Sequence, residues 1–75
     1  MAANDPDMFE FYVKSLKGLG MHTFRVGGET IKGSIVRAAV DFIEVNAIKR
    51  DDDSQREVIR IPFRAIQYVI PAPGA

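Results

Sequence analysis

Residues 61–71, with the sequence IPFRAIQYVIP, decide the fold because they place two short apolar runs on either side of a tight turn. Proline has no backbone N–H to donate to a β-ladder, so Pro62 and Pro71 are each expected at the end of a strand. The segment therefore predicts a fourth strand over about residues 56–62, a turn, and a fifth strand over about residues 66–70.

A polar run separates this stretch from the strand before it. Residues 50–56 contain three aspartates and a serine, a composition typical of an exposed hairpin tip. An acidic metal loop is the alternative, although the run has no longer ligand series and no glycine at the turn. Before it, Ile43, Val45 and Ala47 alternate with larger or polar neighbours, which predicts a third strand over about residues 41–49.

Glycines organise the two strands before that. Gly27 and Gly28 favour a hairpin turn between strands predicted over about residues 21–26 and 29–40. Gly33 falls inside the second of these strands, where a glycine commonly marks a bulge or a sharp bend. Small barrels require bends of this kind.

The N-terminal part predicts one helix. Asp5 followed by Pro6 is a helix-start signal, and glycines at positions 18 and 20 favour its end, which gives a helix over about residues 6–17. Apolar residues recur there at helical spacing, and they are expected to face the sheet. These residues are Met8, Phe9, Tyr12, Val13 and Leu16. Phe9, Tyr12 and Tyr68 are expected to be core or helix-to-sheet contacts, and residues 72–75 to be frayed.

Composition limits the function classes. The 75 residues correspond to a single domain, residues 1–75, whose small core favours stabilisation by oligomerisation. Without cysteine there are no disulfides or thiolate metal sites, and neither a cofactor nor a membrane segment is expected. His22 is expected at the surface or at a strand end with no catalytic constellation around it, so the chain is predicted not to be an enzyme. A cytoplasmic location is expected. The net charge of zero means that any nucleic-acid site must be a local patch.

The predicted fold is therefore mainly β, with a strongly bent, five-stranded antiparallel sheet that forms a partly open barrel. Three segments resemble the Sm/LSm family, closest to the bacterial Hfq-like proteins. They are Asn4-Asp5-Pro6, GGETIKGSI over residues 27–35, and IPFRAIQYVIP over residues 61–71, and together they extend over nearly the whole chain. The resemblance implies an Sm-like (SH3-like) small barrel that assembles into a ring.

In such a ring the fourth strand of one copy pairs with the fifth strand of the next, which satisfies the open sheet edges. The resemblance implies a homo-oligomer of about five to eight subunits, with about six or seven favoured. It also implies single-stranded RNA, A- or U-rich, as the partner, which suggests a role in RNA metabolism or post-transcriptional regulation.

The resemblance also implies two sets of RNA-binding residues. Asn4, Phe42, Phe63 and Arg64 would line an inner-pore pocket, and Phe24, Gly28, Thr30 and Lys32 would form a site on the opposite face. The family's aspartate and asparagine have no matching residues here, because Val40 and Ile43 stand at those positions.

Each of these assignments has an alternative. Phe24 and Phe42 are equally expected in the core, and Arg64 is an alternative candidate for an ion pair across a subunit interface. Six basic residues either form a rim that steers RNA or are an ordinary solvated surface. They are Lys32, Arg37, Lys49, Arg50, Arg56 and Arg60. Two alternatives to the RNA-binding ring remain: a structural or protein-interaction ring without RNA, and an unrelated SH3-like barrel.

Overall fold

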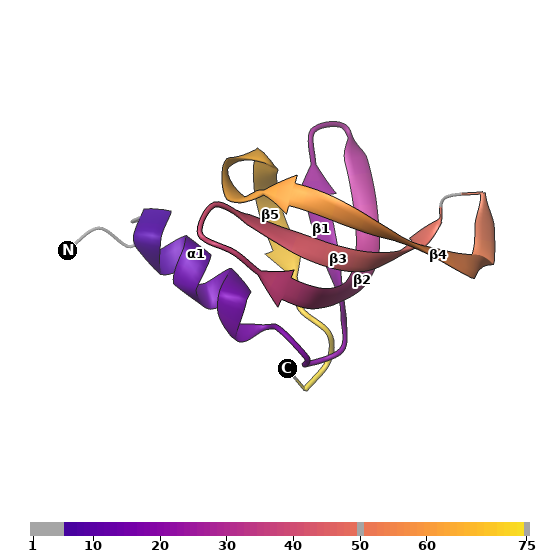
Figure 1. The fold of residues 1–75 in the computed structure, drawn as a ribbon, viewed down its shortest axis with the longest axis horizontal. Helices are drawn as coiled ribbons and strands as arrows, with labels where there is room; N and C mark the ends of the chain where they lie inside the picture. Colours follow the sequence, from indigo (N-terminus) through magenta and orange to yellow (C-terminus); the bar gives the residue numbers. More distant parts are fainter. Residues whose placement is uncertain (1–5, 50, 75) are drawn as a thin grey trace.

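The computed structural model describes residues 6–49 and 51–74, which form one helix and a five-stranded antiparallel sheet (Figure 1). The elements are α1 (Pro6–Ser15), β1 (Met21–Val26), β2 (Glu29–Ala38), β3 (Phe42–Lys49), β4 (Asp52–Pro62), the 3-10 turn η1 (Phe63–Ala65) and β5 (Ile66–Ile70). The prediction of a mainly β fold with an N-terminal helix and five antiparallel strands is confirmed. No helix in these residues is both long enough and apolar enough to cross a membrane.

The strand order places β4 and β5 at opposite edges of the sheet. The order is β4-β3-β2-β1-β5, so the first four strands follow one another as hairpins and β5 returns to pair with β1. The strongly twisted strands curl around their inner face, α1 lies alongside one end, and the β3–β4 hairpin extends from the other (Figure 1). Two strands that are neighbours in sequence therefore become the two edges.

The strand ends differ from the prediction where no apolar alternation marks them. β4 begins at Asp52, because the polar tip pairs back as far as Lys49 opposite Asp52. The Asp52 carboxylate accepts bonds from the Ser54 N–H at 3.0 Å and the Ser54 hydroxyl at 2.6 Å, which stabilises the tip. The predicted exposed tip is confirmed. The helix ends at Ser15, two residues early, and a turn with Gly18 at φ 77° follows.

The inner face of the sheet and one side of α1 form the core. In β3 the predicted alternation is confirmed, with residues 43, 45 and 47 buried and residues 42, 44 and 46 half-buried. The buried apolar side chains are Val13, Leu16, Phe24, Ile35, Ile43, Val45, Ala47, Ile61, Phe63 and Ile66. The predicted burial of Tyr12 and Tyr68 is wrong, because both side chains point away from this core and are 43% and 51% exposed. Met8, also predicted in the stripe, is 56% exposed.

Gly33 allows β2 and β3 to approach closely. A Cβ at Gly33 would lie 2.5 Å from the Asn46 carbonyl oxygen and 2.7 Å from the Ala47 Cα, distances too short for any side chain. The irregularity in pairing lies further along, between Ile35 and Arg37, where Val36 is the extra residue of a β-bulge. Gly33 therefore marks a close approach, and the bulge follows it.

His22 is fully buried, so its predicted position at the surface is wrong, although it does lie near a strand end as the second residue of β1. Its Nδ1 accepts a hydrogen bond from the Ala72 N–H at 2.9 Å, so Nε2 carries the proton and donates to the Leu16 carbonyl at 3.1 Å. The ring joins the end of the helix to the segment after β5. Ala72 is thereby held, so the predicted fraying is wrong for this residue. Pro73 and Gly74 are exposed, and Ala75 lies outside the described residues.

Candidate nucleic-acid interface

Of the residues predicted to line an inner-pore pocket, Phe63 and Arg64 line one pocket, whereas Phe42 lies on another surface. Phe42 lies opposite Pro62 in the β3–β4 ladder, and the Phe63 N–H donates to the Asp41 carbonyl at 3.1 Å, so the backbones are adjacent. The side chains nevertheless diverge. Phe42 is half-buried on the outer face, whereas Phe63 is only 4% exposed and belongs to the core. Asn4 lies outside the described residues.

Arg64 is the exposed member of η1. Within residues 6–49 and 51–74 its guanidinium has no hydrogen-bond or ion-pair partner, and the ion pair considered as its alternative role would cross a subunit interface and stays a prediction. Arg64 lines an open pocket of about 230 Å³ together with Phe9, Glu10, Phe63 and Ile66. The Lys14 ammonium lies 5.5 Å from the centre of the Phe63 ring, which adds a second cation next to this pocket.

The second predicted set is divided between the two faces of the sheet. Phe24 is 0% exposed and packs edge-on against the His22 ring with centroids 6.3 Å apart, so it offers no face to a base. Its partner in the ladder is Ile31, whereas Thr30 and Lys32 alternate onto the outer face. The stacking role of Phe24 is therefore corrected to a core role.

The other three members of that set remain accessible. Gly28 is exposed, with nothing within 4 Å of where a Cβ would lie. Thr30 accepts a hydrogen bond from the Arg25 guanidinium at 3.0 Å, and Lys32 is exposed. They form a polar surface without an aromatic platform.

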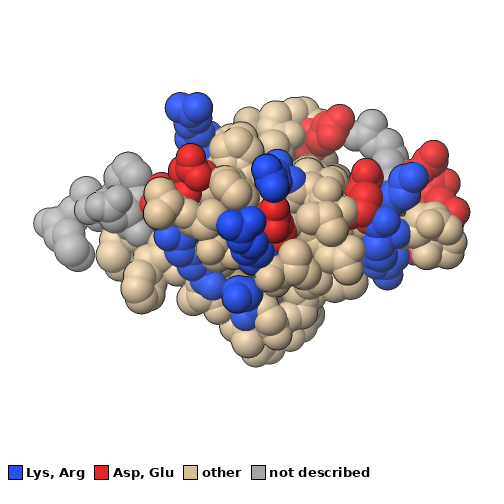
Figure 2. Space-filling view, in the orientation of Figure 1, with Lys and Arg blue, Asp and Glu red and all other residues tan. Residues whose placement is uncertain are grey.

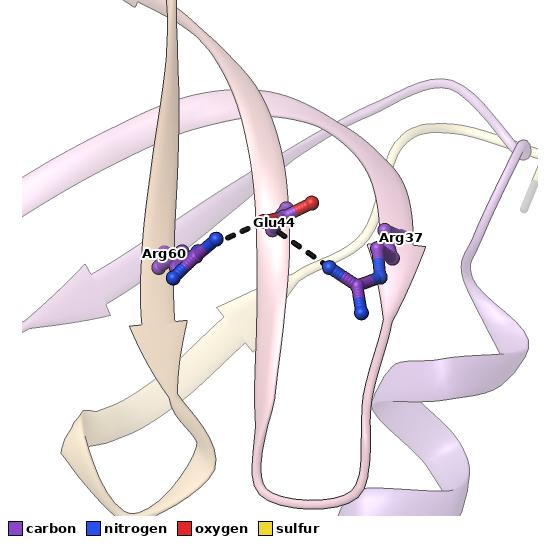
Figure 3. A network of polar contacts seen from close by, with 3 residues as sticks. All are labelled: Arg37, Glu44 and Arg60. Atoms are coloured by element: carbon purple, nitrogen blue, oxygen red, sulfur yellow. Dashed lines mark hydrogen bonds and ion pairs between the residues drawn. The ribbon is translucent and has the colours of Figure 1, made fainter.

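The structure brings together a group that the sequence did not predict, which we call the arginine cluster. It consists of Arg37, Glu44 and Arg60, which Figure 3 shows, and of the ring of Phe42 next to them. Arg37 on β2 and Arg60 on β4 both stand opposite Glu44 on β3. Arg60 Nε donates to Glu44 Oε2 at 2.9 Å, and Arg37 Nη1 lies 3.6 Å from the same oxygen. The two guanidiniums approach the carboxylate from both sides.

Phe42 lies beneath both arginines. Their guanidinium carbons are 5.8 Å (Arg37) and 5.4 Å (Arg60) from the centre of the ring, within range for cation–π attraction. The Arg60 hydrogen bond is the main reason why the pKa of Glu44 falls below its ordinary value; partial desolvation opposes the shift, and the charge of Arg37 supports it. The carboxylate therefore stays ionised at neutral pH, and the cluster carries two positive charges and one negative charge.

A specific sequence signal for the cluster existed. In a regular strand Arg37 would share the inward face of Gly33 and Ile35, which is unfavourable for a charged residue. A bulge between Ile35 and Arg37 turns Arg37 outward, and this is what the structure shows. An arginine at an inward position is therefore the observation that predicts the bulge.

Figure 2 shows the wider surroundings of the cluster: lysine and arginine side chains gather over α1 and the middle of the sheet, with acidic side chains among them. The surface is locally basic although the chain as a whole is neutral. In the part of the chain that the structure describes, no three His, Cys, Asp or Glu side chains are grouped to hold a metal ion.

Comparison with known proteins identifies no relatives. No protein-family model matches the chain, and searches of curated proteins and of solved structures also gave no match. The structure thus defines the class as a small, mainly β domain with one bent five-stranded sheet, and its function has to be argued from its edges and its basic surface.

Proposed function

We propose that this chain is an Sm-like protein that assembles into a closed homo-oligomeric ring and binds single-stranded RNA. One observation carries the proposal: β4 and β5 are the two edges of the sheet, and η1, which joins them, presents the exposed Arg64. Pairing β4 of one copy with β5 of the next would repeat this arginine at every subunit.

The edges favour self-association on physical grounds. An unpaired edge strand exposes backbone N–H and C=O groups that readily pair with another strand. Next to these edges, Val58 on β4 is 64% exposed, and Tyr68 and Ile70 on β5 are 51% and 56% exposed. Edge-to-edge pairing with a second copy would bury part of this apolar surface while satisfying the backbone.

The chemistry near Arg64 favours RNA as the ligand. Arginine presents a planar set of donors that matches phosphate oxygens or a base edge. Arg64 lies at an open pocket with Phe9 and Phe63 in its walls, and Lys14 is next to Phe63. Because this pocket would be repeated at every subunit of a ring, several weak contacts with one RNA would give a strong total affinity.

The experiment combines a mass measurement with RNA binding. Light scattering is expected to give a discrete multiple of the chain mass. Fluorescence polarisation with labelled oligo(U) and oligo(A) is expected to show binding that weakens steeply with salt, because phosphate contacts release counterions. Arg64→Ala is expected to weaken binding about tenfold, the usual cost of one charge-assisted hydrogen bond.

Arg56→Ala is the matched control, because its guanidinium is held at the hairpin tip by the carbonyls of Asp53 and Gln55. A monomer at micromolar concentration would contradict the ring. A ring that binds neither RNA at low salt would instead indicate a structural or protein-interaction module, the alternative that the neutral net charge favours.

A further inference from the structure

We infer that the arginine cluster is a phosphate-binding site for the RNA backbone, separate from the site at Arg64. Arg37 and Arg60 would hold the phosphate, and Glu44 and Phe42 would position the two guanidiniums. This inference rests on the proposed RNA binding and adds a second contact surface to it.

The backbone of β2 turns Arg37 toward the outer face. A β-bulge adds a residue at a cost in regular pairing and is favoured where a strand has to redirect a side chain. Here the extra residue, Val36, allows Arg37 to stand opposite Glu44 and in line with Arg60. Three strands therefore contribute one row of charged side chains across the outer face.

Arg37 and Arg60 both keep unused hydrogen-bond donors. The distance of 3.6 Å from Arg37 Nη1 to Glu44 is too long for a hydrogen bond, so the donors of Arg37 remain available. Arg60 donates to Glu44 through Nε, which leaves both of its terminal amino groups available. Two guanidiniums with unused donors are suited to the oxygens of one phosphate.

The two arginine side chains are exposed to solvent, and their neighbours hold them in place. The side chains of Arg37 and Arg60 are 59% and 70% exposed, while that of Glu44 is 16% exposed. Glu44 and the ring of Phe42 therefore restrain the two cations from below without covering them. Holding donors in place before binding reduces the entropy lost on binding. With two positive charges and one negative charge, the cluster keeps an excess positive charge for an anion.

The cluster is also distinct from the first site. Arg64 lines the pocket that contains Phe9 and Phe63, and none of the four cluster residues lines that pocket. Phe63 faces the core, whereas Phe42 lies on the outer face. The two sites can therefore be substituted separately.

The test uses variants that separate the effect of the planar donor groups of the two arginines from the effect of their charge. Arg37→Lys with Arg60→Lys keeps both charges and removes the planar donor groups, and Arg56→Lys is the matched control. We expect the double lysine variant to bind labelled oligo(U) or oligo(A) about fivefold or more weakly, and the control to bind like the wild type. Arg37→Gln with Arg60→Gln should also reduce the magnitude of the salt slope by about 0.7 for each phosphate whose charge the variant no longer neutralises.

A second measurement uses inorganic phosphate on the whole protein. Side-chain NMR signals of the Arg37 and Arg60 Nε–H groups are expected to shift and saturate with phosphate, and not with chloride at equal ionic strength. Light scattering and circular dichroism check that each variant keeps its assembly and fold.

The RNA function and the phosphate site at the arginine cluster can be contradicted by different results. If the double lysine variant binds RNA like the wild type while Arg64→Ala weakens binding, the cluster is not an RNA site and the RNA function stands. If the wild-type chain binds phosphate at the cluster and no RNA, the RNA function and the assignment to RNA backbone both fall. If phosphate produces no saturable shift, the phosphate site is overturned.

Discussion

His22 is the residue whose position most constrains the molecule. One buried ring bonds the Leu16 carbonyl at the end of the helix and the Ala72 N–H after the last strand. These two segments are far apart in sequence, so one side chain fixes the end of the helix and the segment after β5 to the edge of the core. Replacing the ring with an apolar side chain would leave the Ala72 N–H without this partner, while the Leu16 carbonyl would keep only its bond from the Leu19 N–H at 3.1 Å.

We therefore expect His22→Leu, which has similar volume, to lower the free energy of unfolding by about 1–2 kcal/mol, because the Ala72 N–H loses its partner and the Leu16 carbonyl loses one of its two hydrogen bonds. Urea denaturation followed by circular dichroism measures this loss. Lys32→Ala, an exposed position on the neighbouring strand, is the control and should change the stability by less than about 0.5 kcal/mol. Equal stability of both variants would show that the His22 bonds contribute nothing net.

The two hydrogen bonds of the buried His22 ring could not be predicted from the sequence. Its hydrogen bonds join residues 6 and 50 positions apart, and no local pattern reports on contacts at the longer of these separations. Phe24 was ambiguous for a related reason, since alternation places it on one face of the strand without indicating which face is covered.

Gly28 and Gly33, in the β1–β2 hairpin, provide a further prediction. At Gly33 a methyl group would meet backbone atoms at 2.5 and 2.7 Å, whereas at Gly28 nothing lies within 4 Å. We expect Gly33→Ala to destabilise the fold by about 2–3 kcal/mol, because β2 and β3 have to separate. Gly28→Ala, the matched control measured in the same urea series, should be within about 1 kcal/mol of the wild type. If the two variants behave alike, the close approach at Gly33 is not required.

At the scale of elements, the sequence predicted most of the strands because their apolar alternation is regular. β1 and β5 have the predicted bounds, since glycines and prolines delimit them. The start of β4 was missed because residues 52–55 are entirely polar, and their pairing depends on the hairpin geometry and on the bond from Ser54 to Asp52. The bulge at Val36 was also missed, although the inward position of Arg37 indicates it.

The row of charged side chains across β2, β3 and β4 predicts that the stability of the fold depends on pH. The pKa of Glu44 in the folded protein lies below its ordinary value of 4.5, mainly because of the Arg60 hydrogen bond. As the pH falls, the Glu44 carboxylate therefore takes up a proton at a higher pH in the unfolded chain than in the folded chain. The contribution of Glu44 to stability is complete above pH 4.5 and is lost as the pH falls below 4.5 through the lower pKa of the folded state.

Glu44→Gln removes this titration, so its stability should decrease less than that of the wild type when the pH is lowered from about 6 to about 3. Urea midpoints measured over this range test the prediction. Asp51→Asn, a neutralised aspartate at the exposed tip, is the control and should follow the wild-type curve. A parallel decrease in Glu44→Gln and the wild type would contradict the role of the cluster in stability.

At the scale of the whole molecule, the important feature is that β4 and β5 are adjacent in sequence and opposite in the sheet. Strand order depends on long-range pairing of β5 with β1, which local periodicity does not specify. The sequence alone therefore suggested two open edges but could not assign them to these strands without the family resemblance. The structure assigns the edges, and their pairing between copies is a proposal.

The last prediction tests that proposal directly. Val58→Lys combined with Tyr68→Lys places a cation on each edge strand, where charged side chains block edge-to-edge pairing and like charges repel across a shared ladder. We expect light scattering to show a shift from the oligomer toward the mass of a single chain. Leu19→Lys with Val40→Lys adds the same charge at positions 50% and 84% exposed and outside every strand, so this control should keep the oligomer mass. If the edge variant remains oligomeric with an unchanged circular dichroism spectrum, the copies associate through another surface, and the ring model based on β4 and β5 has to be abandoned.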